Sequence, residues 1–416
     1  MIDNNTETKT CVVIGASHGG VNFAFSLRKE GWLGKIILID KDPLLPYHRP
    51  PLSKSYLTNG DGMDANLLKS KESYDKDQVE LLLGVSVGEI DKEEKYIGLN
   101  NGTKLSYDKL VLATGARPFI PPITGIETAT DLFPLRTGRD VENIRAAFEK
   151  SISKKIVIIG GGYIGLETAA SLKKLGGEVT VLEREARVLA RVTAPEMSSF
   201  FMELHKKNGV DVLVDKNVVS IDNTEGVNTI SCGDGSSYDA DIIIVGVGIK
   251  VNSELAMEAG LTLENGIEVD ETAKTSDASI YAIGDCTYHF NPHYNRKIRL
   301  ESVQNAVDQA KVAAAAICGK SPVYDSIPWF WSDQYDVKLQ MVGLSNDYDE
   351  IVHRSEEGDN KFSIWYFKGS ELLAVDAVNN PKAFVVGTKF LKQSKLIDKA
   401  KLKDNSVVFK PVNLLK

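Results

Sequence analysis

The hydrophobic pattern of the chain repeats one arrangement twice. Near the N-terminus, the apolar run CVVI (11–14) precedes a glycine-rich turn, a stretch with helical spacing of apolar residues, and a second apolar run that ends in Asp40. Residues 155–183 repeat this order with KIVII, GGGYIG and a run that ends in Glu183. Short apolar runs are typical of buried strands, and apolar residues three and four apart indicate a helix. Each copy therefore predicts a strand–helix–strand unit.

The rest of the pattern indicates further domains. Apolar runs at 107–118 and 238–252 end in glycine-containing turns, and residues 300–319 form an alanine-rich helical stretch. From Pro328 onward, clustered aromatic residues and short alternating segments replace this pattern. A chain of 416 residues is also too long for one ordinary core. We predict an α/β protein with two Rossmann-like dinucleotide-binding domains, one formed by 1–121 with 249–325 and one by 122–248, and a C-terminal α+β domain at 326–416.

Composition narrows the class of protein. The formal charge of −8 argues against general nucleic-acid binding, which needs a basic face. The chain contains no apolar run of about 18 residues and no stretch of signal-peptide type, so we expect neither a membrane span nor secretion. Its four cysteines are scattered without metal-ligand or disulfide spacing, which favours a reducing, cytoplasmic location.

Two histidines have the spacing of a helical metal site. His289 and His293 are four residues apart, but Pro292 between them favours a loop, and no third ligand is evident. We therefore expect no metal.

The glycine-rich turns have the spacing that a dinucleotide needs. The first glycine makes the turn, the second lets the backbone approach the pyrophosphate, and the third allows helix–strand packing. Gly160, Gly162 and Gly165 fill all three positions, whereas the first copy has Gly15 and Gly20 but Ser17 between them. Glu183 is placed to accept hydrogen bonds from a ribose 2′-hydroxyl, which favours NADH over NADPH, although the nearby Arg184 and Arg187 oppose that preference.

Six segments in a fixed order resemble one family. They are YHRPPLSKSYL (47–57), LVLATGARP (110–118), GGGYIGLE (160–167), TSDASIYAIGDC (275–286), RLESVQNA (299–306) and PWFWSDQY (328–335). This set is similar to the FAD-dependent NADH:ferredoxin reductases of oxygenase systems, the group of putidaredoxin, rubredoxin and biphenyl dioxygenase reductases. The resemblance extends from Val12 to about Gly343.

The resemblance implies two sets of cofactor contacts and a catalytic pair. For FAD it implies Gly15, Gly19, Gly20, Asp40, Lys41, Arg49, Lys54, Val87, Ala113, Thr114, Gly115, Arg136, Gly284, Asp285, Val303 and Trp331. For NADH it implies Gly160, Gly162, Tyr163, Ile164, Gly165, Glu167, Glu183, Arg191, Val247, Gly248 and Glu301. Lys54 and Glu167 are expected to pair and to act in hydride transfer. Trp329 and Trp331 are expected to cover the flavin and form the electron exit, and packing in the core is the alternative interpretation. From the alternation of side chains in a strand, one indole is expected to point inward and the other outward.

The resemblance also implies the reaction and its partner. We expect hydride transfer from NADH to FAD, followed by single-electron transfer to a 2Fe–2S ferredoxin that serves a Rieske-type or haem-thiolate oxygenase. The alternatives are a rubredoxin or monodehydroascorbate reductase, an NADH oxidase, or an NADH-sensing interaction protein like apoptosis-inducing factor. No nucleic acid or membrane partner is expected, and the protein is expected to be a monomer or a homodimer.

The C-terminal tail is a candidate docking patch. Residues 389–416 contain eight lysines and two aspartates, and ferredoxins of this family are typically acidic. A merely solvated helix face is the alternative interpretation.

Overall fold

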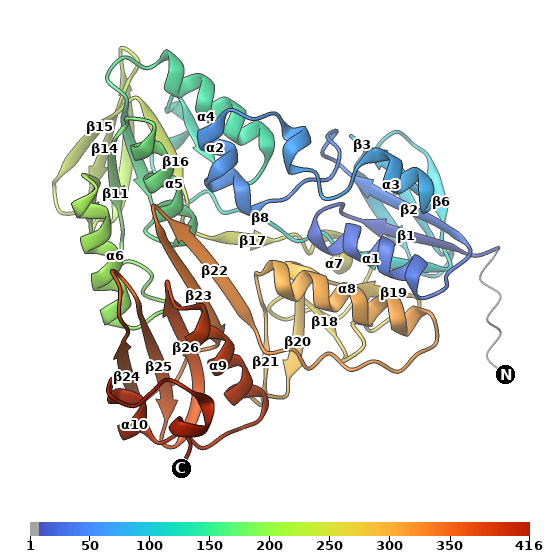
Figure 1. Ribbon diagram of the computed structural model, residues 1–416. Helices are drawn as coiled ribbons and strands as arrows, with labels where there is room; N and C mark the ends of the chain where they lie inside the picture. The colour runs from blue at the N-terminus through green and yellow to red at the C-terminus, as the bar shows by residue number, and fades with distance from the viewer. Residues whose placement is uncertain (1–7) are drawn as a thin grey trace. The chain divides into compact units, whose positions relative to one another are not determined.

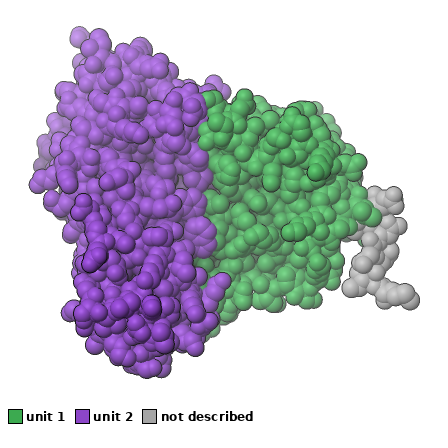
Figure 2. Space-filling model, in the orientation of Figure 1, with its two compact units in different colours: residues 1–49, 62–117, 250–328 green, residues 50–61, 118–249, 329–416 purple. Residues whose placement is uncertain are grey.

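The chain forms two compact units, each built from several segments. A computed structural model describes residues 8–416 (Figure 1). Unit 1 comprises the residues up to 49 together with 62–117 and 250–328, and unit 2 comprises 50–61, 118–249 and 329–416 (Figure 2). Within residues 8–416, no helix combines the length and apolar character needed to cross a bilayer.

The main sheet of unit 1 consists of five parallel strands. Their order is β19-β7-β1-β2-β3, with bounds Ile280–Ala282, Lys109–Leu112, Thr10–Ile14, Lys35–Asp40 and Val79–Leu83. Helix α1 (His18–Lys29) connects β1 to β2. Smaller sheets contain β4 (Val87–Asp91), β5 (Tyr96–Leu99) and β6 (Lys104–Ser106), and β18 (Ile267–Val269), β20 (Thr287–Asn291) and β21 (Arg296–Ile298). Short helices α3 (Lys71–Lys76) and α7 (Glu254–Glu258) complete the unit.

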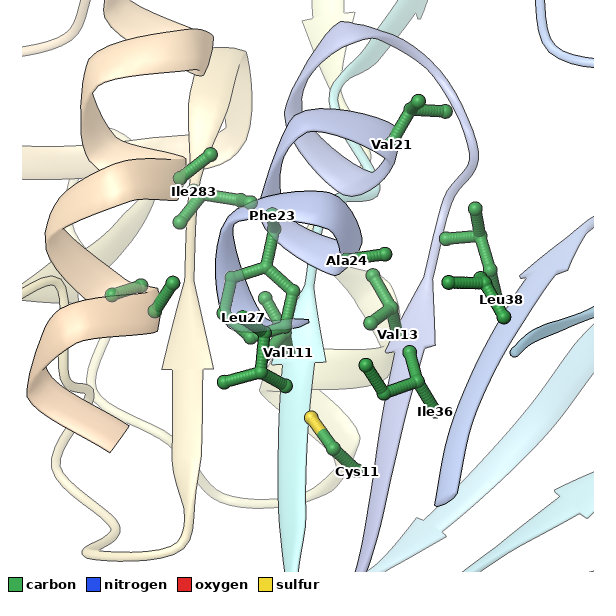
Figure 3. Packing of buried hydrophobic residues seen from close by; sticks show 14 of the residues in the cluster. Cys11, Val13, Val21, Phe23, Ala24, Leu27, Ile36, Leu38, Val111 and Ile283 are labelled. Carbon is green, nitrogen blue, oxygen red and sulfur yellow. The ribbon is translucent and has the colours of Figure 1, made fainter. Parts of the chain in front are cut away.

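One face of this sheet is closed by two helices from opposite ends of the unit's sequence. Helix α8 (Val303–Ile317) lies beside α1, and the core between them contains Phe23 and Leu27 from α1, with Val13 and Val111 from the sheet (Figure 3). The alanine-rich face of α8 permits this close approach, because Ala310, Ala313 and Ala314 are fully buried. The alanine-rich helix predicted from sequence is therefore confirmed.

Unit 2 contains a second parallel sheet of the same type. Its order is β12-β11-β10-β16-β9, with bounds Asp211–Leu213, Glu178–Leu182, Lys155–Ile159, Ile242–Val245 and Leu132–Pro134. Helix α5 (Tyr163–Lys174) connects β10 to β11, as α1 connects β1 to β2. Helices α4 (Gly138–Lys150) and α6 (Pro195–Lys207) and the antiparallel strands β13 (Val218–Thr224), β14 (Val227–Cys232) and β15 (Ser237–Ala240) complete this part. The segment 50–61 adds η1 (Pro50–Ser53) and α2 (Ser55–Asn59).

The C-terminal part of unit 2 is an antiparallel sheet. Its order is β22-β23-β26-β25-β24, with bounds Trp329–Gln334, Val337–Gly343, Glu371–Val378, Phe362–Lys368 and Glu350–Ser355. Helix α9 (Pro381–Lys392) packs on β26 and β23, and α10 (Lys399–Lys403) lies on β24.

Arg354 and Asp376 are two ionisable side chains buried in this part. The guanidinium of Arg354, which is 1% exposed, pairs with Glu356 at 2.7 Å and donates to the backbone oxygens of Leu402, Asp404 and Val407. The buried Asp376 accepts a 2.6 Å hydrogen bond from the Tyr366 hydroxyl, and burial raises the pKa of Asp376 to about 7.

The predicted fold class, with two Rossmann-like sheets and a C-terminal α+β part, is confirmed. The predicted domain boundaries stay a prediction. One local expectation was wrong. His289 lies in strand β20 rather than in a loop, because residues 289–291 pair with 296–298 in an antiparallel hairpin.

Candidate functional site

The expected cofactor residues gather at the carboxyl edges of the two parallel sheets. In unit 1, Gly15 follows β1, Asp40 ends β2, Ala113 follows β7, and Gly284 follows β19. In unit 2, Gly160 follows β10 and Glu183 follows β11. Ligands of open parallel sheets bind outside these carboxyl ends, so both edges have the position of a nucleotide site.

In each unit, the first and third glycines of the turn are required by close packing. Gly15 has φ +106° and Gly160 has φ +112°, conformations that an L side chain rarely adopts. A Cβ atom on either would also collide with a carbonyl oxygen of the adjacent turn, that of Ala113 or of Gly246. A Cβ on Gly20 or Gly165 would strike the carbonyl oxygen of the first glycine of its own turn.

The second position of the turn has the same extended backbone in both units. No atom lies within 4 Å of a Cβ built on Gly162. Ser17 occupies the corresponding position in unit 1 with the same extended backbone, since φ and ψ are −95° and −157° for Ser17 and −79° and −179° for Gly162. Each residue directly precedes its helix, whose first N–H groups lack an acceptor within the helix. The serine therefore leaves the anion-binding geometry of the turn unchanged.

The acid after the second strand holds the turn in place in both units. The Asp40 carboxylate accepts from the backbone N–H of Ala16 at 2.6 Å and of Asp42 at 2.9 Å. The Glu183 carboxylate likewise accepts from the N–H of Gly161 at 2.6 Å and of Glu185 at 2.8 Å. Each acid thus ties its strand end to the residue after the first glycine.

The two arginines near Glu183 already have partners. Arg187 donates to the backbone oxygens of Thr193 and Ala190 and to the Ser198 hydroxyl, each at 2.8 Å. Arg184 is largely exposed and pairs with Glu185 at 2.9 Å.

The expected ion pair between Lys54 and Glu167 is present. Lys54 Nζ lies 2.6 Å from Glu167 Oε2. Lys54 directly precedes α2, whereas Glu167 projects from α5 and is only 2% exposed. A buried carboxylate needs such partners, because burial without them costs several kcal/mol.

Two serines that were not predicted complete the surroundings of Glu167. The Ser53 hydroxyl donates to Oε2 at 2.6 Å, and the Ser332 hydroxyl donates to Oε1 at 2.7 Å. Ser53 precedes Lys54 in the segment PPLSKS, and Ser332 follows Trp331 in PWFWS. Their positions beside residues already singled out were the only sequence signal for them.

The tryptophans of β22 do not point in opposite directions. The rings of Trp329 and Trp331 are 5.6 Å apart, and both side chains are half-buried. The expectation of one inward and one outward indole was wrong, because residues two apart in a strand share a face. Trp329 also packs edge-on against Phe384 of α9 at 5.9 Å.

The remaining predicted residues are distributed over both units. In unit 1, Gly19 lies in the first turn of α1, Lys41 follows β2, Val87 starts β4, and Val303 starts α8, and the other members are Arg49, Thr114, Gly115, Asp285 and Glu301. In unit 2, Tyr163 and Ile164 start α5, and the other members are Arg136, Arg191, Val247 and Gly248. Thr114 donates to the backbone oxygen of Asn252 at 2.7 Å, Glu301 pairs with Arg299, and Tyr163 contacts Met341.

None of the four cysteines has the environment of a reactive thiol. All are free, Cys11, Cys232 and Cys286 are buried, and Cys318 is partly exposed. Burial raises the pKa of each of these thiols. Since the thiolate is the nucleophile, this favours inert side chains.

Comparison with known proteins agrees with this geometry. Residues 9–310 match the family described as pyridine nucleotide-disulphide oxidoreductase, and residues 329–413 match the reductase C-terminal family. The chain belongs to the pyridine nucleotide-disulphide oxidoreductases.

Within that family, the chain is similar to two reductases and to one solved complex. The chain is 40% identical to putidaredoxin reductase of Pseudomonas putida over 96% of both chains. It is 37% identical to a rubredoxin–NAD(+) reductase of the same species, over 89% of this chain and 96% of the relative. It also matches the structure of a covalent putidaredoxin reductase–putidaredoxin complex with a TM-score of 0.91 and 40% identity, over 96% and 97% of the two chains.

The family implies a flavin and a nicotinamide nucleotide. The residues present fit such groups, since each unit has a glycine turn closed at its first and third positions and an acid that holds it. The residue at the second position directly precedes a helix in both units.

Proposed function

We propose that this protein is an FAD-dependent reductase that oxidises NADH and passes single electrons to a 2Fe–2S ferredoxin of an oxygenase system. The observation that carries the proposal is the likeness to putidaredoxin reductase over 96% of both chains, including the C-terminal part. Both glycine turns and the Lys54–Glu167 pair lie within the part that matches.

FAD is assigned to unit 1 and NADH to unit 2. In unit 1 the turn at Gly15–Gly20 would hold the FAD pyrophosphate and Asp40 the ribose. In unit 2 the complete turn at Gly160–Gly165 would hold the NADH pyrophosphate. The flavin, when bound, accepts a hydride equivalent and returns its electrons one at a time.

Lys54 and Glu167 would act as one charged unit at the reaction site. The Lys54 ammonium provides a fixed positive charge, and Glu167 holds it through a 2.6 Å ion pair. Ser53 donates to the same carboxylate oxygen as Lys54. The low exposure of Glu167 reduces the screening of its carboxylate by water, which strengthens its attraction for Lys54.

NADH is the proposed nucleotide rather than NADPH. The Glu183 carboxylate lies at the strand end where the ribose 2′-position is expected, and a 2′-phosphate there would meet its negative charge. Arg187 is held by two backbone oxygens of its own loop and by the Ser198 hydroxyl of α6, so it is not free to neutralise that phosphate.

The ferredoxin is proposed to dock beside the tryptophans of β22. The packing of Trp329 on Phe384 connects this strand to α9. The exposed side of α9 carries a shallow hollow lined by Phe384, Val385, Thr388, Lys389, Lys392 and Gln393. Val385 is 62% exposed. An apolar centre with lysines at its rim suits an acidic protein partner.

Thiol chemistry is disfavoured as an alternative. Disulphide and persulphide reactions need an accessible thiolate, and burial raises the pKa of all four thiols. Four free thiols also suit a reducing compartment, so we place the reaction in the cytoplasm.

An anaerobic titration tests the proposed function. The purified protein is expected to be yellow, to lose its flavin absorbance on addition of one equivalent of NADH, and to recover it when oxidised 2Fe–2S ferredoxin is added. Rubredoxin and dioxygen serve as competing acceptors. A colourless protein, a flavin that does not respond to NADH, or faster reoxidation by dioxygen than by ferredoxin would contradict the proposal.

A further inference from the structure

A continuous chain of buried hydrogen bonds ends on Glu167. The Tyr335 hydroxyl lies 3.2 Å from His205 Nδ1, and His205 Nε2 lies 2.9 Å from Gln334 Oε1. Gln334 Nε2 donates to Ser332 Oγ at 3.2 Å, and Ser332 Oγ donates to Glu167 Oε1 at 2.7 Å. This hydrogen-bond chain thus connects the end of α6 through β22 to α5.

The direction of every bond follows from the carboxylate. Glu167 Oε2 accepts from Lys54 and Ser53, and its Oε1 accepts from Ser332. Because a serine has one O–H, Ser332 must accept from its other neighbour, so the amide nitrogen of Gln334 faces it. The amide oxygen of Gln334 then faces His205, which must carry its proton on Nε2. The unprotonated Nδ1 accepts the O–H of Tyr335.

The three middle members of this hydrogen-bond chain are enclosed, and both of its ends line the same cleft. His205 and Ser332 are fully buried, and Gln334 is 1% exposed. Burial lowers the pKa of His205, which agrees with a neutral ring. Tyr335 lines an open cleft of about 1260 Å³, which is also lined by Lys54 and Asn360. An enclosed chain of donors that all point one way stabilises a negative charge at its end.

We propose that His205, Gln334 and Ser332 are positioning residues for Glu167, which keep its Oε1 occupied by a donor and its Oε2 directed to Lys54. The proposal rests on the proposed function, in which the Lys54–Glu167 pair serves the reduction of flavin by NADH. None of the three residues needs to touch either cofactor, because each acts through the carboxylate.

The tautomer of His205 is a direct test that does not depend on activity. Two-bond ¹H–¹⁵N correlation spectra of the flavin-loaded protein at pH 7 report the protonation of each ring nitrogen, and the His205 signals are those lost in His205→Gln. We expect a protonated Nε2 and an unprotonated Nδ1. A proton on Nδ1 together with an unprotonated Nε2 would show that the hydrogen-bond chain does not run toward Glu167.

Gln334→Glu is designed to turn the Ser332 hydroxyl away from Glu167, and the new side chain has almost the same shape as glutamine. The new carboxylate competes with Glu167 for the Ser332 hydroxyl and favours a doubly protonated His205 in the same spectra. Stopped-flow reduction at saturating NADH should slow about tenfold, with a smaller effect on the Kd for NADH. Asn360→Asp is the matched control, because it adds the same charge at the cleft without touching the chain, and its rate should equal that of the wild type. Ser332→Ala, which removes the donor to Oε1, should slow reduction to a similar extent.

A double-mutant cycle separates positioning from general disturbance. In a Glu167→Gln background, Gln334→Glu should have little further effect, because the carboxylate that the chain serves is gone. An equal slowing in both backgrounds, or a wild-type rate for both Gln334→Glu and Ser332→Ala, would overturn the inference. If NADH does not reduce the wild-type flavin, the proposed function fails. The tautomer spectra still decide whether the hydrogen-bond chain from Tyr335 to Glu167 is present.

Discussion

Asp40 and Glu183 show how one side chain serves two purposes at a nucleotide turn. Each carboxylate accepts two backbone N–H groups, one of them from the residue after the first glycine. In the proposed function, a change of this acid would therefore alter both the charge beside the ribose and the anchoring of the turn.

Glu183→Gln is expected to weaken the preference for NADH. The substitution keeps the length of the side chain but removes the negative charge that would oppose a 2′-phosphate. The ratio of kcat/KM for NADH to that for NADPH should fall at least about fivefold. The exposed Glu178 at the start of β11 provides the control, and Glu178→Gln should leave the ratio unchanged. An unaltered ratio in Glu183→Gln would remove this residue from nucleotide selection.

Lys54→Met should slow flavin reduction without loss of flavin. The substitution removes the ammonium that pairs with Glu167 at 2.6 Å and leaves that carboxylate buried without its cation. The limiting rate of reduction by NADH should fall roughly 10- to 100-fold in stopped-flow measurements. Lys76→Met, at an exposed position of α3, should behave as the wild type. Equal rates in both variants would exclude Lys54 from the mechanism.

At the scale of elements, one buried arginine connects β24 to the C-terminal segment 402–407. Arg354 on β24 reaches three backbone oxygens of the segment 402–407 and the carboxylate of Glu356. Arg354→Met should lower the free energy of unfolding by about 3 kcal/mol in urea titrations and expose residues 399–416 to proteolysis. The exposed Lys395 gives the matched control, since Lys395→Met should change neither measurement. A stable, protease-resistant Arg354→Met variant would contradict this account.

Elements with strong local periodicity were predictable, and contacts between distant elements were not. The two strand–turn–helix–strand units and α8 follow from apolar spacing and glycine position, which depend only on neighbouring residues. Ser332 contacts Glu167 only because β22 packs against α5, and Gln334 contacts His205 only because β22 lies beside α6. Nothing in their own segments indicates these contacts. The orientation of the two tryptophans was predicted wrongly although strand geometry alone determines it.

At the scale of the whole molecule, Asp376 should make stability depend on pH. Its carboxyl is buried and its pKa is raised to about 7, so the folded protein binds this proton more tightly than the unfolded chain does. The contribution of Asp376 to the free energy of unfolding should therefore be greatest below about pH 4. It should be lost as the pH rises through 7. The loss is on the order of 4 kcal/mol.

Chemical denaturation at pH 5 and pH 8 measures this contribution. Asp376→Asn should lose less stability between the two values than the wild type does. In Asp404→Asn the wild-type slope should persist, because Asp404 is exposed and its pKa is lowered, chiefly by the Ser406 hydroxyl. A wild-type slope in Asp376→Asn would show that other groups cause the pH dependence.

Charge reversal should locate the ferredoxin surface. Lys389→Glu combined with Lys392→Glu changes the hollow on α9, and kcat/KM for ferredoxin should fall about tenfold at low salt, less at high salt. Reduction by NADH in the absence of ferredoxin should be unaffected. Lys401→Glu combined with Lys403→Glu on α10 should have a much smaller effect. A larger effect from α10 would move the docking patch from α9 to α10.

The packing of α8 on α1 affects how the protein folds during its synthesis. Phe23, Leu27 and Val13 reach the ribosome exit early, but the helix that covers them is encoded after residue 302. At typical translation speeds the stretch 118–249 alone takes on the order of ten seconds to synthesise. During that interval, strands β1, β2, β3 and β7 have been synthesised, but neither the edge strand β19 nor the covering helix α8 has been made. We therefore expect chaperones that hold apolar segments to engage nascent chains that end before residue 303, and to release them once α8 has emerged.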